Sequence, residues 1–274
     1  REQRTAISEI YRQYLDIAFK YNLPLLLSTP TWRASRERIE KAGYEKTDVN
    51  GDNFRHLDEM RKNYGEYANK VVISGLMSCR GDAYNQSEAL TSKDAHKFHS
   101  WQANRLAEAG VDFLLAATLP ALSEATGLAT ALAATGKPYI MSFVFRPEGT
   151  LLDSTPLKDA ISIIDSDVNP KPIAYMANCT HASIFKTAIM HATHSSATVR
   201  NRVAGLLANT AALNPEELDD SEELVEEDPQ IFGQSVANLH GELGMKILGG
   251  CCGTDDRHID NLAKRLVSEN LRPG

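Results

Sequence analysis

Two adjacent cysteines near the C-terminus, Cys251 and Cys252, are the residues of this chain best suited to chemistry. They follow an apolar run and two glycines, and a third glycine comes directly after them. Glycine allows the backbone to turn tightly and to approach a ligand closely. Neighbouring cysteines seldom bridge each other, because a disulfide places its Cα atoms farther apart than adjacent residues do. The pair therefore indicates metal ligands or reactive thiols, and the alternative is two small buried residues that pack like hydrophobes.

Short apolar runs and amphipathic segments alternate along the chain and must position these thiols. The apolar runs predict parallel strands over residues 25–27, 71–76, 111–116, 139–144, 173–177, 203–207 and 246–248. Helical periodicity predicts helices over residues 5–22, 34–42, 54–68, 92–109, 122–135, 157–164, 182–191, 231–243 and 257–267. The acidic run 216–228 is expected to be a solvated loop or the start of a helix.

Strand, loop and helix repeat without hairpin signals, so parallel strands joined by helical crossovers are expected. The two architectures of this kind are a doubly wound open sheet and a (β/α)8 barrel, also called a TIM barrel. Seven strands precede seven helices, and the chain opens with a further helix that has no strand before it. This count predicts an α/β chain folded as a TIM barrel, with the first strand apparently missing from this chain and residues 1–274 forming a single domain.

In such a barrel the functional residues lie at the carboxyl ends of the strands. Three cysteines are expected to meet there and to hold zinc with three thiolates and one open position: Cys179, Cys251 and Cys252. Cys79 also follows a strand, but a fourth thiolate would close the site against substrate, so we expect it not to be a ligand.

Three thiolates around zinc suit one kind of reaction. They weaken zinc as an activator of water, whereas a substrate thiol in the fourth position would lose its proton and attack an activated methyl group. Zinc hydrolases instead use mostly imidazole and carboxylate ligands. The histidine pairs at positions 96 and 99, and 191 and 194, lie within predicted helices and are expected to be surface or packing residues.

Several motifs resemble those of the homocysteine S-methyltransferase family. The residues that carry the resemblance are Gly249-Gly250-Cys251-Cys252-Gly253-Thr254 with His258 and Ile259 beyond, Asn178-Cys179, Thr29-Pro30-Thr31-Trp32-Arg33-Ala34, and Asn209. The resemblance implies a (β/α)8 barrel that holds zinc and methylates a thiol such as homocysteine, forming methionine. It also implies that Thr29, Asn178 and Asn209 contact the substrate, with no catalytic residue beyond the metal ligands.

The chain departs from the family pattern in two places. The family's first strand, which carries an Asp-Gly-rich motif, is absent, and Ala117 occupies the position of a family Glu that engages the substrate amino group. Glu124 is the nearest acid along the chain. We therefore expect homocysteine to be a poorer substrate here than is usual for the family.

Composition bounds the partners. A net charge of −7 argues against a nucleic-acid partner, and no apolar run is long enough for a membrane helix. Four cysteines are too few for a disulfide scaffold in this length, so a reducing, cytoplasmic setting is expected. The family resemblance implies that the partners are a small thiol and a methyl donor, and a homo-oligomer remains open.

Three readings of function compete. The first is a zinc-dependent thiol S-methyltransferase whose donor is small and free, because no nucleotide loop or additional domain is evident. The second is a zinc-containing barrel that binds a thiol metabolite with little or no turnover, or one that methylates a different thiol. The third, a redox protein using Cys251 and Cys252, lacks the Cys-x-x-Cys spacing that such chemistry uses.

Overall fold

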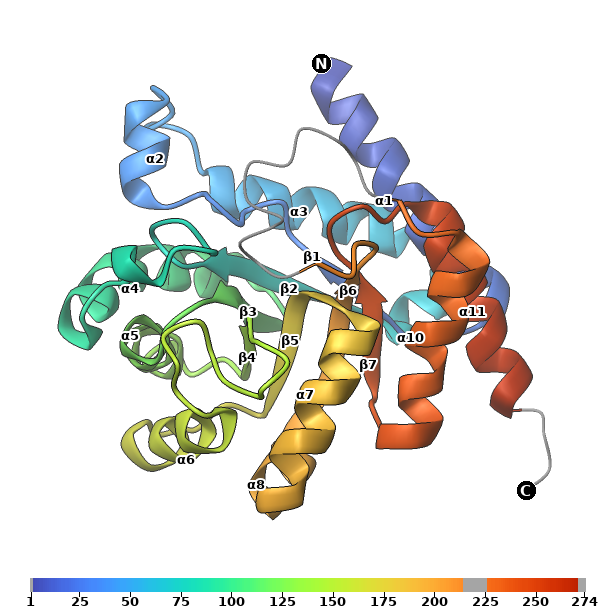
Figure 1. The fold of residues 1–274 in the computed structure, drawn as a ribbon. Coiled ribbons are helices and arrows are strands. Elements are labelled where there is room, and N and C mark those ends of the chain that lie inside the picture. The colour runs from blue at the N-terminus through green and yellow to red at the C-terminus, as the bar shows by residue number, and fades with distance from the viewer. Residues whose placement is uncertain (1, 214–225, 271–274) are drawn as a thin grey trace.

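The computed structural model describes residues 2–213 and 226–270. Its seven strands form one parallel sheet in chain order, β1-β2-β3-β4-β5-β6-β7. The sheet curls into an open half-barrel with the helices on its outer side (Figure 1). The strands are β1 (Leu25–Ser28), β2 (Val71–Ser78), β3 (Phe113–Leu119), β4 (Tyr139–Phe143), β5 (Ala174–His181), β6 (Val203–Asn209) and β7 (Ile247–Gly250).

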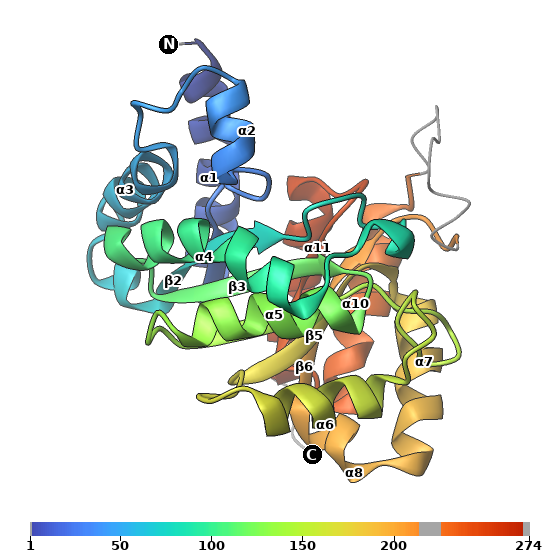
Figure 2. The same ribbon diagram turned by 90° about the vertical axis from the view of Figure 1, so that its left-hand side faces the viewer.

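Helices connect successive strands and pack against the outer face of the sheet, as the view in Figure 2 shows for α4, α5 and α6. They are α1 (Glu2–Tyr21), α2 (Arg36–Lys41), α3 (Val49–Lys62), α4 (Ser92–Ala109), α5 (Leu122–Ala133), α6 (Leu157–Asp167), α7 (Ala182–Ser195), α8 (Ala197–Arg202), α10 (Pro229–Leu243) and α11 (Asp256–Asn270), with 3-10 turns at Gly65–Lys70 and Gln86–Glu88. None of the helices in the described part of the chain is long and apolar enough to cross a membrane.

Successive side chains along each strand point to opposite faces of the sheet, so the apolar residues form two layers. On β3 the side chains of Phe113, Leu115 and Ala117 face the inside of the half-barrel, whereas Leu114 and Ala116 belong to the larger core beneath the helices. Both faces are apolar because a parallel sheet is covered by helices on one side and filled by its own side chains on the other. The sheet therefore forms a rigid frame whose carboxyl ends share one rim.

An apolar groove separates the two edge strands. Its volume is about 1220 Å³, and it is lined by residues of β1, β7 and α1, including Ile7, Ile10, Leu26, Ile247 and Cys251. Within the described residues, β1 pairs only with β2 and β7 pairs only with β6. The groove thus opens the inside of the half-barrel along its side and reaches the rim at Cys251.

The sequential strand order confirms the predicted parallel sheet and excludes the doubly wound alternative, which requires a reversal of strand order. The predicted helix 92–109 is confirmed, with Thr91 capping its first turn and Gly110, at φ 101°, ending it. The predicted helix 54–68 was wrong in its bounds, because α3 begins earlier, at Val49, where Asp48 caps it. Helix α8 was missed. The acidic run 216–228 lies largely outside the described residues.

Candidate metal centre

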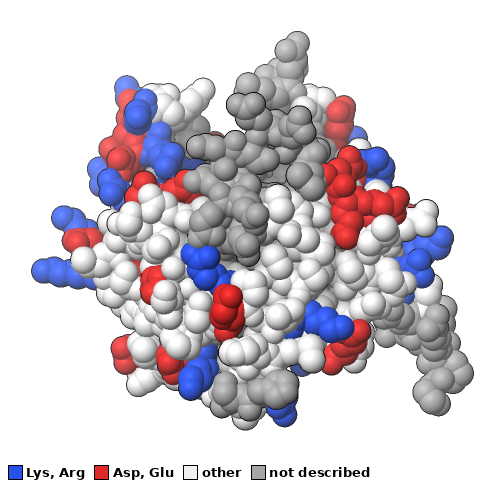
Figure 3. Space-filling view, in the orientation of Figure 1, with Lys and Arg blue, Asp and Glu red and all other residues white. Residues whose placement is uncertain are grey.

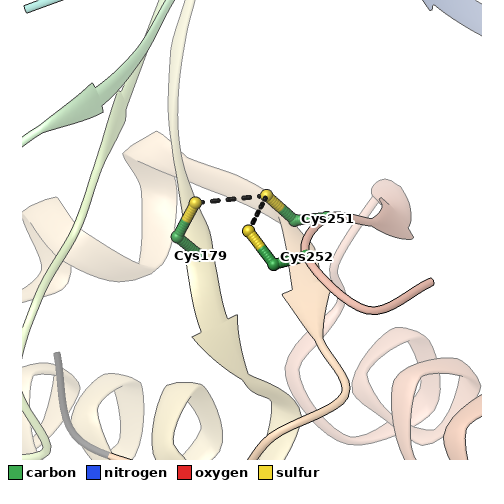
Figure 4. Close-up of side chains that lie close together, drawn as sticks. All are labelled: Cys179, Cys251 and Cys252. Atoms are coloured by element: carbon green, nitrogen blue, oxygen red, sulfur yellow. Dashed lines mark hydrogen bonds between the residues drawn. The ribbon is translucent and has the colours of Figure 1, made fainter. Parts of the chain in front are cut away.

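Three cysteine sulfurs meet at the carboxyl rim of the sheet (Figure 4). Cys179 lies near the end of β5, and Cys251 and Cys252 directly follow β7. The Sγ atoms of Cys179 and Cys251 are 3.1 Å apart, those of Cys251 and Cys252 are 3.9 Å apart, and all three lie within 4.8 Å of one another. Two segments separated by 72 residues in sequence thus supply one compact group of sulfur donors.

A bulge aims the Cys179 side chain. The register between β5 and β6 shifts between Asn178 and Thr180, and Cys179 has a φ of 54°. A left-handed conformation is uncommon for a residue with a Cβ, and such positions concentrate at functional sites. Sequence patterning predicted that the strand would end at residue 177, whereas β5 continues to His181 and carries the cysteine within it.

Asn178 ties the bulge to the neighbouring strands. Its Oδ1 atom accepts hydrogen bonds from the Thr118 backbone N–H, at 2.9 Å, and from the Ser142 hydroxyl, at 2.7 Å. Its Nδ2 atom donates to the Cys179 sulfur at 3.2 Å. Because the side chain is buried, these three bonds fix its orientation, and the amide becomes a permanent donor to the sulfur.

Asn209, at the end of β6, performs a related task for the second cysteine segment. Its Oδ1 atom accepts a hydrogen bond from the Cys252 backbone N–H at 3.1 Å. The side chain is 1% exposed, and its Nδ2 atom has no hydrogen-bond partner among the residues that the structure describes. A buried amide nitrogen without an acceptor is costly, so it points to a ligand that would accept its hydrogen bond.

The three thiols share protons unequally. Hydrogen bonds from Cys179 and from Cys251 lower the pKa of Cys252 to about 3. The hydrogen bond with Cys251, that with Cys252 and burial raise the pKa of Cys179 well above its ordinary value. Cys251 accepts a bond from Cys179, which lowers its pKa, but its bond to Cys252 and desolvation outweigh this and raise the pKa to about 12. Mutual hydrogen bonding and burial therefore hold the pKa of Cys252 below the ordinary thiol value and those of Cys179 and Cys251 above it.

Tyr84 also belongs to this centre, and sequence reasoning missed it. It lies in the loop between β2 and α4, packs against Val144, Leu152 and Cys179, and its hydroxyl is within hydrogen-bonding reach of the Cys179 sulfur. Burial, followed by the nearby cysteines, raises the pKa of Tyr84 above its ordinary value. No local sequence pattern distinguishes this tyrosine from an ordinary loop aromatic.

The other rim residues lie in different surroundings. Thr29 is fully buried, and its hydroxyl accepts a hydrogen bond from the Leu76 backbone N–H at 3.0 Å and pairs with Thr31, so these contacts join β1 to β2. Cys79 is a buried free thiol whose sulfur contacts the Gly81 carbonyl, and it is not part of the three-sulfur group.

Ala117 faces the inside of the half-barrel, where its neighbours are Leu115, Ile140 and Met176. Glu124, the acid nearest to it along the chain, is committed elsewhere. It is 1% exposed, and its carboxylate accepts hydrogen bonds from the backbone N–H groups of Arg80 and Leu90 and contacts His99. Glu124 therefore does not replace the family carboxylate at the position of Ala117.

A second group of metal-ligand side chains, Glu226, Asp255 and His258, lies at the start of α11. Arg257 forms ion pairs with both acids, and the two ring nitrogens of His258 contact Asp255 Oδ1, at 2.8 Å, and the Glu227 carbonyl, at 3.0 Å. These internal partners explain the group as an ion-pair cluster. The three sulfurs form the stronger candidate for a metal site.

The family model for homocysteine S-methyltransferase matches residues 2–266. The chain belongs to the homocysteine S-methyltransferase family. This confirms the family inferred from the double-cysteine and Asn-Cys motifs.

Curated relatives are distant in sequence. Betaine–homocysteine S-methyltransferase 1 of Bos taurus is 22% identical over 98% of this chain and 66% of its own length. Homocysteine S-methyltransferase of Escherichia coli is 28% identical over 68% of this chain and 56% of its own length. The chain thus spans less than two thirds of these relatives.

Among solved structures, the homocysteine methyltransferase MmuM of Escherichia coli in its oxidized form superposes with a TM-score of 0.75 at 20% identity, covering 96% of this chain and 85% of that one. Its metallated form gives a TM-score of 0.73 at 20% identity, covering 94% of this chain and 84% of that one. At this identity the likeness shows a shared α/β fold.

Proposed function

We propose that this protein is a zinc-dependent S-methyltransferase that moves a methyl group from a small activated donor to a thiol such as homocysteine, forming methionine. The convergence of Cys179, Cys251 and Cys252 at the rim of the sheet is the observation that carries the proposal. Membership of the homocysteine S-methyltransferase family supports the reaction class.

The donor set fits zinc. Soft thiolates favour zinc over the hard cations that carboxylates bind, and three protein ligands leave one position open. A tetrahedral site with zinc–sulfur bonds of about 2.3 Å separates its sulfurs by roughly 3.8 Å. The 3.9 Å between Cys251 and Cys252 matches this value, and the Cys179 sulfur, 3.1 Å from Cys251, would have to move away by several tenths of an ångström.

When bound, zinc would take the substrate sulfur as its fourth ligand and favour its thiolate form. The residues of the chain prepare the site for this thiolate. Asn178 donates to the Cys179 sulfur, and the unpaired Nδ2 atom of buried Asn209 offers a hydrogen bond to the substrate. Thr29 remains a proposed substrate contact on the strength of its motif, although its hydroxyl already has partners.

Within the described residues, the interior beneath the rim, including Leu115, Ala117 and Met176, is apolar and offers no polar side chain to the reacting sulfur from below. A thiolate is less solvated on its apolar side and is therefore a better nucleophile toward a methyl group. No side chain is assigned a catalytic role beyond the three cysteines.

Metal content tests the proposal directly. We expect one zinc per chain, and replacing any one of Cys179, Cys251 and Cys252 by Ser should remove most of the metal and the activity. Cys79→Ala is the matched control, because it alters a buried thiol outside the three-sulfur group and should keep both. Full zinc retention by Cys179→Ser would disprove the proposed ligand set.

The apolar surroundings of Ala117 bear on the substrate. A carboxylate beside the substrate ammonium would contribute about 1.5–3 kcal/mol, at least tenfold in affinity, and alanine contributes none of it. We therefore propose that homocysteine is a poor substrate and that Ala117→Glu improves kcat/KM for it. An efficient wild-type enzyme that Glu does not improve would return the protein to the usual family substrate.

Alanine at position 117, in place of a carboxylate, also favours a second candidate function, a zinc-containing barrel that binds a thiol with little turnover. Donor screening with several thiols separates the two. Methyl transfer to any of them supports the enzyme, whereas thiol binding detected by calorimetry without methyl transfer supports the binding protein. The four unpaired cysteines suit a reducing cytoplasm, and oligomeric state is a separate measurement.

We also propose that one further strand closes the half-barrel in the groove between β1 and β7, so that residues 1–274 belong to one barrel domain. In β1 the backbone N–H and C=O groups of Leu26 point away from β2. In β7 those of Ile247 and Gly249 point away from β6, so the groups of both strands face the groove. Apolar residues on both the α1 side and the inner side suit a strand buried on both faces. Extending the chain before α1 by an apolar strand should slow hydrogen exchange at Leu26 and Ile247, and a strand interrupted by proline should not.

A further inference from the structure

A buried acid and a buried histidine lie behind the loop that carries Tyr84. Glu124 is in the first turn of α5, His99 is in α4, and both side chains are at most 2% exposed. The Nε2 atom of His99 lies 2.9 Å from Glu124 Oε1. The proposed methyl transfer uses neither residue, and burying this pair is costly unless every partner is satisfied.

The carboxylate holds both ends of one loop. Glu124 Oε1 accepts a hydrogen bond from the Arg80 backbone N–H at 2.7 Å, and Oε2 accepts one from the Leu90 backbone N–H at 3.1 Å. Arg80 and Leu90 flank the connection from β2 to α4. The adjacent Ser123 adds a hydroxyl bond to the Leu90 carbonyl at 2.9 Å.

The middle of this loop meets the three sulfurs. Tyr84 packs against the buried cluster of Val144, Leu152 and Cys179, and Cys251 packs against the same cluster. Within the loop, the Tyr84 backbone N–H donates to Asp82 at 2.8 Å, a local turn that does not itself anchor the loop to the barrel. Arg33 also donates to the Arg80 and Gly81 carbonyls, at 3.1 and 2.6 Å, but the Glu124 carboxylate is the group that binds both ends of the loop.

We infer that Glu124, supported by His99, is a positioning residue that fixes the loop between β2 and α4 and through it places Tyr84 over the three cysteines. The inference rests on the proposed function for the importance of the centre, but the contacts that carry it are independent of any metal. Two backbone N–H groups on opposite ends of a loop require an acceptor with two oxygens, which a carboxylate supplies.

Glu124→Gln is the sharpest test. The amide group keeps the shape of the side chain but replaces one oxygen by an NH2 group, which cannot accept from a backbone N–H, so one loop end loses its acceptor. In metal-free protein, we expect hydrogen exchange at Arg80 or Leu90 and alkylation of Cys179 by iodoacetamide to accelerate at least about tenfold, the effect of losing one charge-assisted hydrogen bond. Exchange at Leu114, in the centre of the sheet, should not change.

Two comparisons distinguish a positioning role of Glu124 from a general contribution of this residue to the stability of the fold. Glu59→Gln makes the same change at an exposed acid of α3, outside the loop, and should leave Cys179 alkylation unchanged. Tyr84→Ala should accelerate alkylation directly, and adding Glu124→Gln to it should give no further acceleration, because both act through the same side chain. Independent, multiplying effects of the two changes would overturn the inference.

The measurement uses no zinc and no methyl donor, so its failure and the failure of the proposed function are distinguishable. If Glu124→Gln does not fold, Glu124→Asp replaces it, since the shorter carboxylate reaches one loop end only and should accelerate alkylation by at least about threefold. Rates within twofold of the unaltered protein in a folded Glu124 variant would overturn the inference.

Discussion

The centre and the edges of the sheet differ in how completely they are packed. All five residues of β4 are buried, whereas none of the four residues of β7 is, and in β1 only Leu27 is buried. The candidate metal centre joins these two environments, because Cys179 comes from the buried strand β5 and Cys251 and Cys252 follow the partly exposed strand β7. One candidate ligand therefore lies on a strand that is paired on both sides, and the other two depend on an edge strand that, within the described residues, is paired on one side only.

Charged side chains of both signs are spread over the surface. On the face shown in Figure 3, basic and acidic side chains are interspersed over the described part of the chain rather than forming one basic surface. The expectation of no nucleic-acid partner rests on the net charge of −7 and stays a prediction.

Truncating a central side chain should have the largest effect. Phe143 on β4 is fully buried and stacks on Tyr175 with ring centroids 5.9 Å apart. Phe143→Ala should lower the free energy of unfolding by about 3–5 kcal/mol, because it removes apolar contacts and leaves a cavity. Leu25→Ala, on half-exposed β1, is the edge control and should cost less than about 2 kcal/mol in urea unfolding. Equal costs would remove the distinction between centre and edge.

Sequence patterning predicted all seven strands, and the bounds of the edge strands were as close as those of the central ones: 25–27 against Leu25–Ser28 for β1, and 111–116 against Phe113–Leu119 for β3. The continuous apolar runs of β3 and β4 are long, and their neighbours enforce pairing on both sides, so residues such as Leu114 and Met141 could be assigned from hydrophobicity alone. Predicting that Cys179 lies beside Cys251 required the additional knowledge that the carboxyl ends of parallel strands meet at one rim. Tyr84 and Glu124 could not be predicted, because their contacts arise from a loop whose path depends on tertiary packing.

Zinc should strengthen the weaker half of the site. If it binds the folded chain alone, zinc at 100 times its dissociation constant should raise the free energy of unfolding by about 2.7 kcal/mol. Because two ligands follow β7, hydrogen exchange at Ile247 and Leu248 should slow more than exchange at Leu114. Cys179→Ser should abolish the difference. Uniform protection across the sheet would contradict the idea that the edge strand limits the site.

A glycine change can displace the edge strand from the core. A Cβ at Gly205 of β6 would lie 1.8 Å from the Ile247 carbonyl oxygen, a backbone atom that cannot yield without moving β7. Gly205→Ala should cost about 1–3 kcal/mol and weaken zinc binding by separating the cysteine segments. Gly249→Ala is the matched control, since its Cβ would meet only the flexible end of Leu207 at 3.0 Å. Similar zinc affinities for the two variants would show that β7 is not displaced.

The smallest effect should come from single hydroxyl groups, which compare the edge and the centre at the scale of one hydrogen bond. The Tyr11 hydroxyl donates to the Ser28 carbonyl of β1 at 2.6 Å, and the Tyr139 hydroxyl of β4 donates to the Pro170 carbonyl at 2.7 Å. Burial raises the pKa of both tyrosines, so each remains a donor at neutral pH. Removing either hydroxyl leaves a carbonyl without its donor, and the cost depends on whether water can take its place.

The groove beside β1 is about 1220 Å³ in volume and includes both Tyr11 and Ser28 in its lining, so water can reach the Ser28 carbonyl when the hydroxyl is absent. Tyr139 is 1% exposed, but its acceptor belongs to exposed Pro170, so water can reach that carbonyl as well. Tyr11→Phe and Tyr139→Phe should therefore each lower the free energy of unfolding by about 0.5–1 kcal/mol, measured by urea unfolding of both variants side by side. A cost for Tyr11→Phe well above that for Tyr139→Phe would mean that the groove is closed to water, as it would be if a further strand already filled it.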